Sequence, residues 1–123
     1  MDAFISWVEA PRRGKYKTGA KPMEKMAMSL PAFDWDKENI GHIAKHQVTP
    51  DEAEEVILND PLDVSFDPEM NGEERWTYLG ETNTGRIMDV VITLRGEKIR
   101  VVTAYEAERK DKLLFLEMKA GQQ

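Results

Sequence analysis

Two side chains of this sequence are suited to transferring protons at neutral pH. His46 is the strongest acid–base candidate, because imidazole gains and loses a proton near neutrality, and Lys45 stands directly before it. Tyr105 could donate a phenolic proton or stack on an aromatic ring. Each has a structural alternative: His46 could cap the C-terminal end of a helix, and Tyr105 could anchor the junction of a strand and a helix.

Four arginines in the second half of the sequence are candidate phosphate ligands, because a guanidinium group presents a planar fork of N–H donors to phosphate oxygens. Arg75 and Arg86 lie near expected turns at strand edges, and Arg109 lies near the start of an expected helix. Arg100 alternates with apolar Val101 and therefore points to the opposite face of its strand. The alternative for each is an ordinary solvated surface residue.

Two other patterns have competing interpretations. Trp76 could stack on a nucleotide base, or it could pack in the core. His42 and His46 are one helical turn apart, with Glu38 one turn earlier, so the three could face a common metal ion. No further ligand is well placed and no His-Glu-x-x-His pattern occurs. We therefore expect neither a metal nor another cofactor.

The charge is divided unevenly between two parts of the chain. Residues 1–32 carry six basic and three acidic side chains, a balance of +3. Residues 33–123 carry 11 basic and 20 acidic side chains, a balance of −9, which gives −6 for the whole chain. An acidic domain repels nucleic acid at long range, so any function that involves RNA must overcome this repulsion.

Residues 1–32 are expected to form an irregular basic leader, since prolines and glycines interrupt them. The leader is either disordered or contains a short helix around Phe4, Trp7 and Val8. The chain has no cysteine, no apolar run that could span a membrane, and no signal-peptide pattern at its start. These features favour the cytoplasm.

Two helices are expected at the start of the domain. Asp34 or Asp36 can cap a helix over residues 37–46. Thr49-Pro50-Asp51-Glu52 combines an N-cap, a first-turn proline and a glutamate at the third helical position. This combination predicts a second helix over residues 50–58.

The remainder predicts four strands and a final helix. Alternating or β-branched apolar residues predict strands over residues 62–67, 75–82, 87–94 and 99–104, followed by a helix over 106–119. Residues 67–72 are expected to form a loop, and short turns should join the later strands as an antiparallel meander. The prediction is an α+β domain over residues 33–123 with two N-terminal helices, a four-stranded antiparallel sheet and a C-terminal helix.

A series of short motifs runs through this domain in order. They are Phe33-Asp34-Trp35-Asp36, Lys45-His46-Gln47-Val48, Asp60-Pro61-Leu62, Gly72-Glu73-Glu74-Arg75-Trp76, Gly85-Arg86, Ile99-Arg100-Val101-Val102-Thr103-Ala104 and Glu108-Arg109-Lys110. Together they resemble the BrnT family of ribonuclease toxins. Tyr105 stands where the family has an arginine, Gln47 where glycine is usual, and His42 where asparagine is common.

The resemblance implies a RelE-like fold and a type II toxin that cleaves single-stranded RNA without a cofactor. It also implies a BrnA-like antitoxin with a ribbon-helix-helix region, through which alone the complex would contact operator DNA, and no membrane association. In such a site, a base takes the 2′-hydroxyl proton, an acid protonates the 5′-oxygen, and cations hold the phosphate. The residues assigned to this chemistry are Lys45, His46, Arg75, Arg86, Tyr105 and Arg109, with Arg100 and Trp76 as further RNA contacts.

Tyr105 and the acidic domain also motivate a different hypothesis. The chain could keep the toxin fold and act as a non-catalytic module that binds an antitoxin-like protein. A solitary domain without a toxin role is the third possibility.

Overall fold

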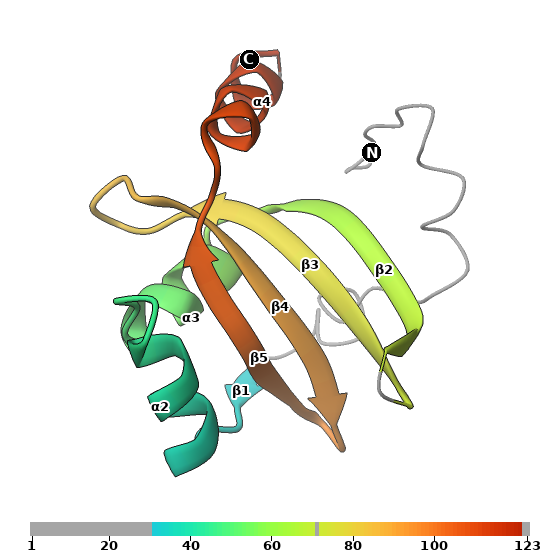
Figure 1. Cartoon of the computed structure of the whole chain (residues 1–123). Coiled ribbons are helices and arrows are strands. Elements are labelled where there is room, and N and C mark those ends of the chain that lie inside the picture. The colour runs from blue at the N-terminus through green and yellow to red at the C-terminus, as the bar shows by residue number, and fades with distance from the viewer. Residues whose placement is uncertain (1–30, 71, 122–123) are drawn as a thin grey trace.

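The computed structural model describes residues 31–70 and 72–121, and the expected leader lies almost entirely outside them. The elements in chain order are β1 (Ala32–Phe33), α2 (Lys37–Ala44), α3 (Pro50–Leu58), β2 (Leu62–Met70), β3 (Glu73–Glu81), β4 (Ile87–Arg95), β5 (Lys98–Glu106) and α4 (Arg109–Ala120) (Figure 1). No helix in the described ranges is both long enough and apolar enough to cross a membrane.

The strands form one mixed sheet in the order β1-β5-β4-β3-β2. Strands β2 to β5 make the antiparallel meander that the sequence predicts. The expected count of four strands is wrong, because β1 adds a fifth strand parallel to β5. This strand has two residues, too few for an alternating pattern, and its pairing with β5 continues in a hydrogen bond from Asp34 N to Ile99 O at 2.9 Å.

The expected loop over residues 67–72 is also wrong in part, because β2 continues to Met70. Pro68 cannot donate a ladder hydrogen bond, but β2 lies at the edge of the sheet, where proline is tolerated. The register against β3 shifts between Asp67 and Met70, which accommodates the interruption. At the other end of the sheet, β5 extends to Glu106, so α4 begins at Arg109 rather than at residue 106.

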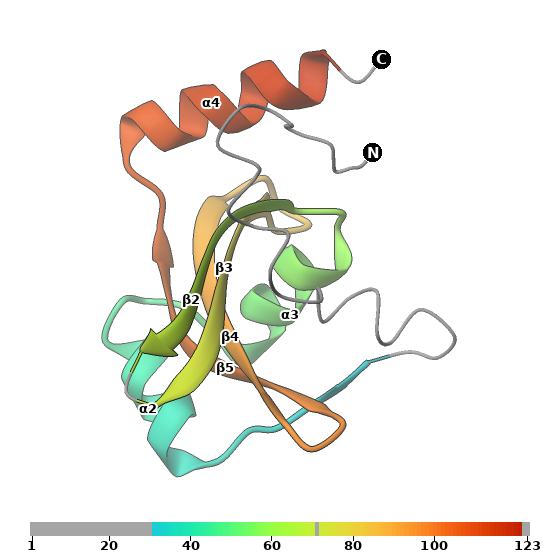
Figure 2. The same ribbon diagram turned by 90° about the vertical axis from the view of Figure 1, so that its right-hand side faces the viewer.

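Helices α2 and α3 cover one face of the sheet (Figures 1 and 2). The main core lies beneath them, where Ile43 and Val56 belong to one buried cluster with Trp76 and Val90. On the opposite face, Phe115 of α4 belongs to a second cluster with Leu62, Leu79, Ile87 and Ala107. Helix α4 crosses one end of this second face, and no other described helix covers it (Figure 2).

Helix α2 is fixed along the edge of β5. Asp36 caps the helix in a reciprocal capping box with Asn39. The buried Asn39 amide also donates to Val101 O at 3.1 Å and to Asp34 O at 2.9 Å. The bond to Val101 O ties the first turn of α2 to β5, and Ile43 on the next turn packs into the main core.

The end of α2 is closed by a Schellman motif, which sets the position of His46. Val48 N donates to Ile43 O at 3.2 Å, and Gln47 N donates to Ala44 O at 2.9 Å. Gln47 therefore has a φ of 63°, in the left-handed region that favours glycine. Glycine is usual at this position in the family that the sequence resembles, and the left-handed φ gives a conformational reason for that preference.

Candidate active site

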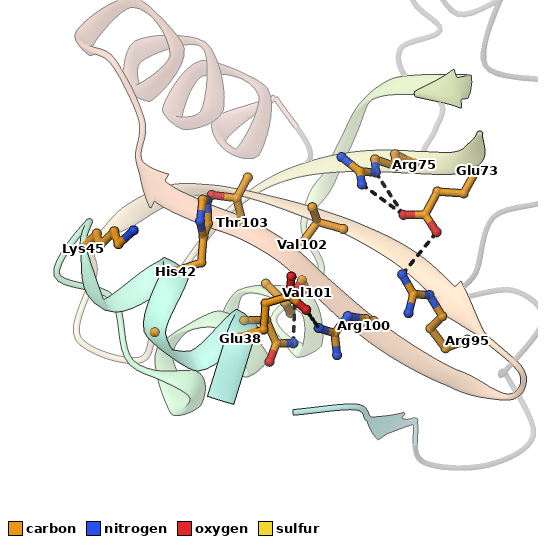
Figure 3. A pocket seen from close by; sticks show the side chains of 12 residues that line it. Glu38, His42, Lys45, Glu73, Arg75, Arg95, Arg100, Val101, Val102 and Thr103 are labelled. Carbon is orange, nitrogen blue, oxygen red and sulfur yellow. Dashed lines mark hydrogen bonds and ion pairs between the residues drawn. The ribbon is translucent and has the colours of Figure 1, made fainter. Parts of the chain in front are cut away.

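A hollow of about 690 Å³ lies on the uncovered face, between α2 and strands β3, β4 and β5 (Figure 3). Its charged lining residues are Lys45, Arg75, Arg95, Arg100, Glu38 and Glu73, and His42 lines it as well. Four cations thus face two carboxylates in a domain whose overall balance is −9. Asp34 and Asp36 lie outside the lining and neutralise Arg100, so the accessible positive charge of the hollow is that of Lys45, Arg75 and Arg95.

The strand register brings these residues together. Arg75 alternates with the buried Trp76 and so points to the uncovered face. Arg100 is the direct partner of Thr93, two residues before Arg95 on β4. A bulge between the pairs Val91–Thr103 and Ile92–Val101 leaves an extra residue, Val102, in β5. Val102 and Thr103 consequently both line the hollow.

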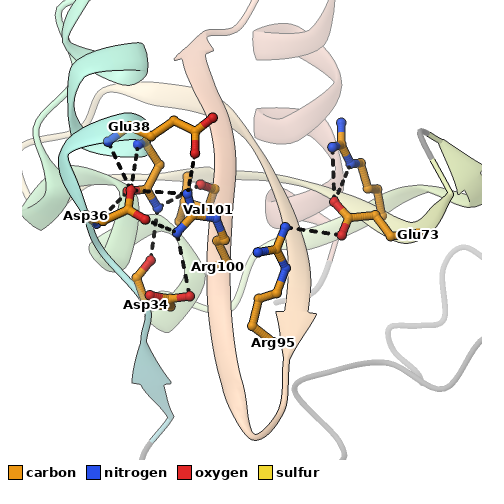
Figure 4. Close-up of polar contacts among 9 residues, drawn as sticks. Asp34, Asp36, Glu38, Glu73, Arg95, Arg100 and Val101 are labelled. Atoms are coloured by element: carbon orange, nitrogen blue, oxygen red, sulfur yellow. Dashed lines mark hydrogen bonds and ion pairs between the residues drawn. The ribbon is translucent and has the colours of Figure 1, made fainter.

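Arg100 is held by three carboxylates at the start of α2 (Figure 4). Its guanidinium donates to both carboxylate oxygens of Asp36 at 3.1 Å, and it pairs with Asp34 at 3.5 Å and Glu38 at 3.4 Å. These partners, Asp36 first, raise the pKa of Arg100, and the same hydrogen bonds lower the pKa of Asp36. The fork of Arg100 is therefore occupied, and it joins β5 to α2.

Arg75 and Arg95 share one carboxylate on the opposite side of the hollow. Arg75 donates from Nε at 3.2 Å and from Nη2 at 3.0 Å to Oε2 of Glu73. Arg95 donates from Nη2 to Oε1 of the same Glu73 at 3.3 Å. The Arg75 side chain is 19% exposed and that of Arg95 is 51% exposed. Both guanidinium groups are accessible from the hollow.

Three rings lie at the α2 end of the site. The His46 ring centroid is 5.7 Å from that of His42 and 5.9 Å from that of Tyr105, edge-on in both cases. His42 lines the hollow, so His46 and Tyr105 adjoin it. The structure thus brings together the two acid–base candidates of the sequence, His46 just after the end of α2 and Tyr105 on β5.

The phenol of Tyr105 is kept protonated by its surroundings. Partial burial raises its pKa above the ordinary value, and the negative charges of Asp89, Asp111 and Glu108 raise it further. Asp89 is the direct cross-strand partner of Tyr105. Burial, followed by repulsion from Asp111 and Glu108, raises the pKa of Asp89 to about 6. At neutral pH, Tyr105 is a proton donor.

Arg86 is not among the residues that line the hollow, but it contacts the residues that follow His46 and Tyr105. Its Nη1 donates to Gln47 O at 3.0 Å and to Glu52 at 2.8 Å, and its Nη2 pairs with Glu106 at 3.5 Å. The hydrogen bond to Glu52 is the main reason that the pKa of Arg86 is raised. Arg86 therefore links the residue after His46 to the residue after Tyr105.

The two remaining candidates lie elsewhere. Trp76 is 2% exposed and packs against Phe66 with ring centroids 5.2 Å apart, so its core alternative is the one that the structure shows. Trp76 has no free face for a nucleotide base. Arg109 is exposed at the first turn of α4 and is not among the lining residues. Among residues 31–70 and 72–121, no three His, Cys, Asp or Glu side chains gather as metal ligands.

Arg95 is the lining cation that the sequence analysis missed, because Arg95-Gly96-Glu97 has the composition of a turn. The pairing register of the β3–β4 hairpin could have placed Arg95 in the site. Glu81 pairs with Ile87 and Trp76 with Ile92, so the hairpin is centred on Thr84. The same centre brings Glu73 opposite Arg95. A register counted outwards from the expected turn between residues 82 and 87 could therefore have identified this pair.

A comparison with protein families identifies the class of protein that carries this site. The family described as ribonuclease toxin, BrnT, of type II toxin–antitoxin system matches residues 35–111, more than half of the chain. The chain belongs to the BrnT family. No curated protein matches it. The resemblance found in the sequence is thereby confirmed, and membership implies an RNA target and an antitoxin partner for this BrnT-family chain. The matched segment contains the hollow, both histidines and Tyr105.

Proposed function

We propose that this chain is an endoribonuclease toxin that cleaves single-stranded RNA without a metal ion, in the hollow on the uncovered face of its sheet. The observation that carries the proposal is the set of accessible cations in the hollow, Lys45, Arg75 and Arg95, beside His46 and Tyr105. A phosphodiester backbone is attracted to such a patch even when the rest of the domain is acidic, because exposed charges beyond a Debye length of ~8 Å are largely screened.

The proposed reaction is an attack of the RNA on itself. The 2′-oxygen bonds to phosphorus, the bond from phosphorus to the 5′-oxygen breaks, and the products end in a 2′,3′-cyclic phosphate and a 5′-hydroxyl. His46 takes the proton from the 2′-hydroxyl, and Tyr105 gives a proton to the leaving 5′-oxygen. The phenol of Tyr105 is protonated at neutral pH, as a general acid must be, although its raised pKa makes it a weaker acid than an ordinary tyrosine.

Lys45 and Arg75 stabilise the charge that develops on the phosphate. Both line the hollow, and neither is enclosed in a carboxylate cage such as the one around Arg100. In this proposal Arg100 is a positioning residue that keeps α2 against β5. Arg86 is a second positioning residue, because it holds the backbone after His46 and the strand end after Tyr105. Tyr105 stands where the family has an arginine. It can replace the hydrogen bond that the arginine would donate, while Lys45 and Arg75 supply the positive charge.

The proposed partner is a BrnA-like antitoxin with a ribbon-helix-helix region. Family membership supports this partner. It also supports a cytoplasmic location, where the protein would encounter both RNA and the antitoxin. Operator DNA would be contacted only through the antitoxin.

The test uses the purified full chain with a defined single-stranded RNA in excess EDTA. Wild type should cleave, and His46→Ala and Arg75→Ala should each lower the rate by at least ~100-fold. Lys110→Ala removes an exposed charge outside the hollow and serves as the control, with unchanged cleavage. Folding of each variant is verified by circular dichroism.

The ion pairs already made by Arg75 and Arg100 favour one other function, a non-catalytic domain that binds a protein partner. No cleavage by folded wild type at high concentration would contradict the nuclease and select this alternative.

A further inference from the structure

The arginine pair opposite the histidines has more positive charge than its own carboxylate can neutralise. Arg75 and Arg95 both donate to Glu73, which leaves the trio with a net charge of +1. An ion pair that served only to join β3 to β4 would need one arginine. Asp67 of β2 is the direct cross-strand partner of Arg75, so the charge that Glu73 does not neutralise lies chiefly on the exposed guanidinium of Arg95, which can bind a further anion.

The geometry of the trio matches a small oxyanion. Three N–H groups converge on the two oxygens of one carboxylate, at 3.0, 3.2 and 3.3 Å. Carboxylate and phosphate oxygens accept the same forked hydrogen bonds from guanidinium groups. Glu73 thus occupies the position at which a phosphate would receive these donors.

The position of the trio relative to the proposed chemistry is equally specific. Glu73, Arg75 and Arg95 lie at the end of the hollow away from His42 and Lys45 (Figure 3). Val102 and Thr103 of the β5 bulge line the floor between the two ends. An RNA strand whose reacting phosphate lies beside the histidines would extend its backbone towards this trio.

From this arrangement we infer that Arg75 and Arg95 form a binding subsite for a second, non-reacting phosphate of the RNA, and that Glu73 competes with this phosphate in the free protein. The inference rests on the proposed function for the identity of the ligand. It adds a residue, Arg95, and a competitor, Glu73, that the proposed reaction does not require. Arg75 is then shared between the reacting phosphate and its neighbour.

The first test measures binding apart from cleavage. A fluorescent six-nucleotide strand with 2′-deoxy sugars cannot undergo the proposed attack, so its affinity for the full chain is measured by anisotropy. Arg95→Ala should weaken binding by about ten-fold, since a hydrogen bond between charged groups has about that effect. It should also make the slope of log affinity against log salt concentration shallower by ~0.7.

The second test removes the competitor. Glu73→Gln should tighten binding of the same strand by about three- to ten-fold, because both guanidinium groups lose the anion that they share. Glu74→Gln is the matched control: it makes the same charge change one residue later, on the opposite face of β3, and should leave affinity unchanged.

A substrate comparison separates this inference from the proposed function. Arg95→Ala should lower kcat/KM for a six-nucleotide RNA by raising KM. It should leave kcat/KM unchanged for a dinucleoside monophosphate, which has one phosphate.

Unchanged binding of the strand by folded Arg95→Ala would overturn the inference even if wild type cleaves RNA. Unchanged or weaker binding by folded Glu73→Gln would do the same. Normal phosphate-dependent binding without cleavage by wild type would overturn the proposed reaction alone. If Glu73→Gln does not fold, Arg95→Ala, at an exposed side chain, still decides.

Discussion

His46 lies edge-on to Tyr105 with ring centroids 5.9 Å apart, although one residue follows α2 and the other lies near the end of β5. The Schellman motif at the end of α2 places the histidine, and the pairing of β5 with β4 places the tyrosine. The short distance between these rings brings a candidate general acid, Tyr105, and a candidate general base, His46, together on one side of the hollow. The predictions below start from this pair.

Tyr105→Phe keeps the ring and removes the proton donor. We expect kcat for RNA cleavage to fall by about 100-fold or more, with RNA affinity unchanged, because general acid catalysis contributes at least that factor. In the wild type, the raised pKa of Tyr105 keeps the phenol protonated through neutral and mildly alkaline pH, so its ionisation should cause no loss of rate over that range. Steady-state kinetics from pH 6 to about pH 9.5 measure both effects. Equal rates for Tyr105→Phe and wild type would remove the tyrosine from the reaction.

Arg86→Ala loosens the backbone on both sides of the ring pair. The hydrogen bond to Gln47 O at 3.0 Å and the pair with Glu106 at 3.5 Å are lost together. We expect kcat to fall by about ten-fold while the affinity for the 2′-deoxy strand stays within about two-fold, because positioning affects the reaction more than binding. Arg86→Lys, which keeps the charge, should recover part of kcat. A loss of RNA affinity equal to the loss of kcat would instead assign Arg86 to phosphate binding.

Asp89→Asn tests the buried carboxyl of the residue that pairs with Tyr105 across β4 and β5. The pKa of Asp89 is raised to about 6 in the folded protein, so folding favours its protonated form. This residue therefore costs no stability below its ordinary pKa, and its cost grows as the pH rises towards 6 and is fully present above it. The variant should be more stable than wild type by roughly 1–3 kcal/mol at pH 7.5, and the difference should shrink towards zero at about pH 4. Urea denaturation at both pH values measures this, and a difference independent of pH would contradict the account of Asp89.

Gln47→Gly tests the conformational reason for the glycine that is usual in the family. Gln47 has a φ of 63°, which costs a residue with a Cβ roughly 1–2 kcal/mol. The variant should gain about 0.5–1 kcal/mol of stability in urea denaturation, after glycine's own entropy cost is deducted. Gln47→Ala removes the same side chain and keeps the Cβ, so it should show no such gain. Equal gains in both variants would trace the effect to the glutamine side chain.

Local signals were enough to predict the two N-terminal helices and the β2–β5 meander. The Thr49-Pro50-Asp51-Glu52 motif forms the expected capping box, and the turn around Thr84 joins β3 to β4 as expected. Strand β1 could not be predicted, because two residues carry no period and its backbone pairs with a strand far along the chain. The passage of β2 through Pro68 depends on its edge position, which is a property of the whole sheet.

Prediction of the site divides in the same way. Residue type and the family resemblance selected His46, Lys45, Arg75 and Tyr105, which the structure gathers in or beside the hollow. The hydrogen-bond and ion-pair partners of each cation could not be predicted from the sequence. The carboxylates around Arg100, the sharing of Glu73 by two arginines, and the link made by Arg86 all come from contacts between distant segments.

The ends of the cleaved RNA test the central claim most directly. A single-stranded RNA is incubated with the full chain in excess EDTA, and the fragment masses are determined by mass spectrometry. Attack by the 2′-hydroxyl, as proposed for His46 and Tyr105, predicts a 2′,3′-cyclic phosphate on one fragment and a 5′-hydroxyl on the other, and no cleavage where that nucleotide is 2′-deoxy. Fragments that end in a 3′-hydroxyl and a 5′-phosphate, or cleavage that EDTA abolishes, would contradict it.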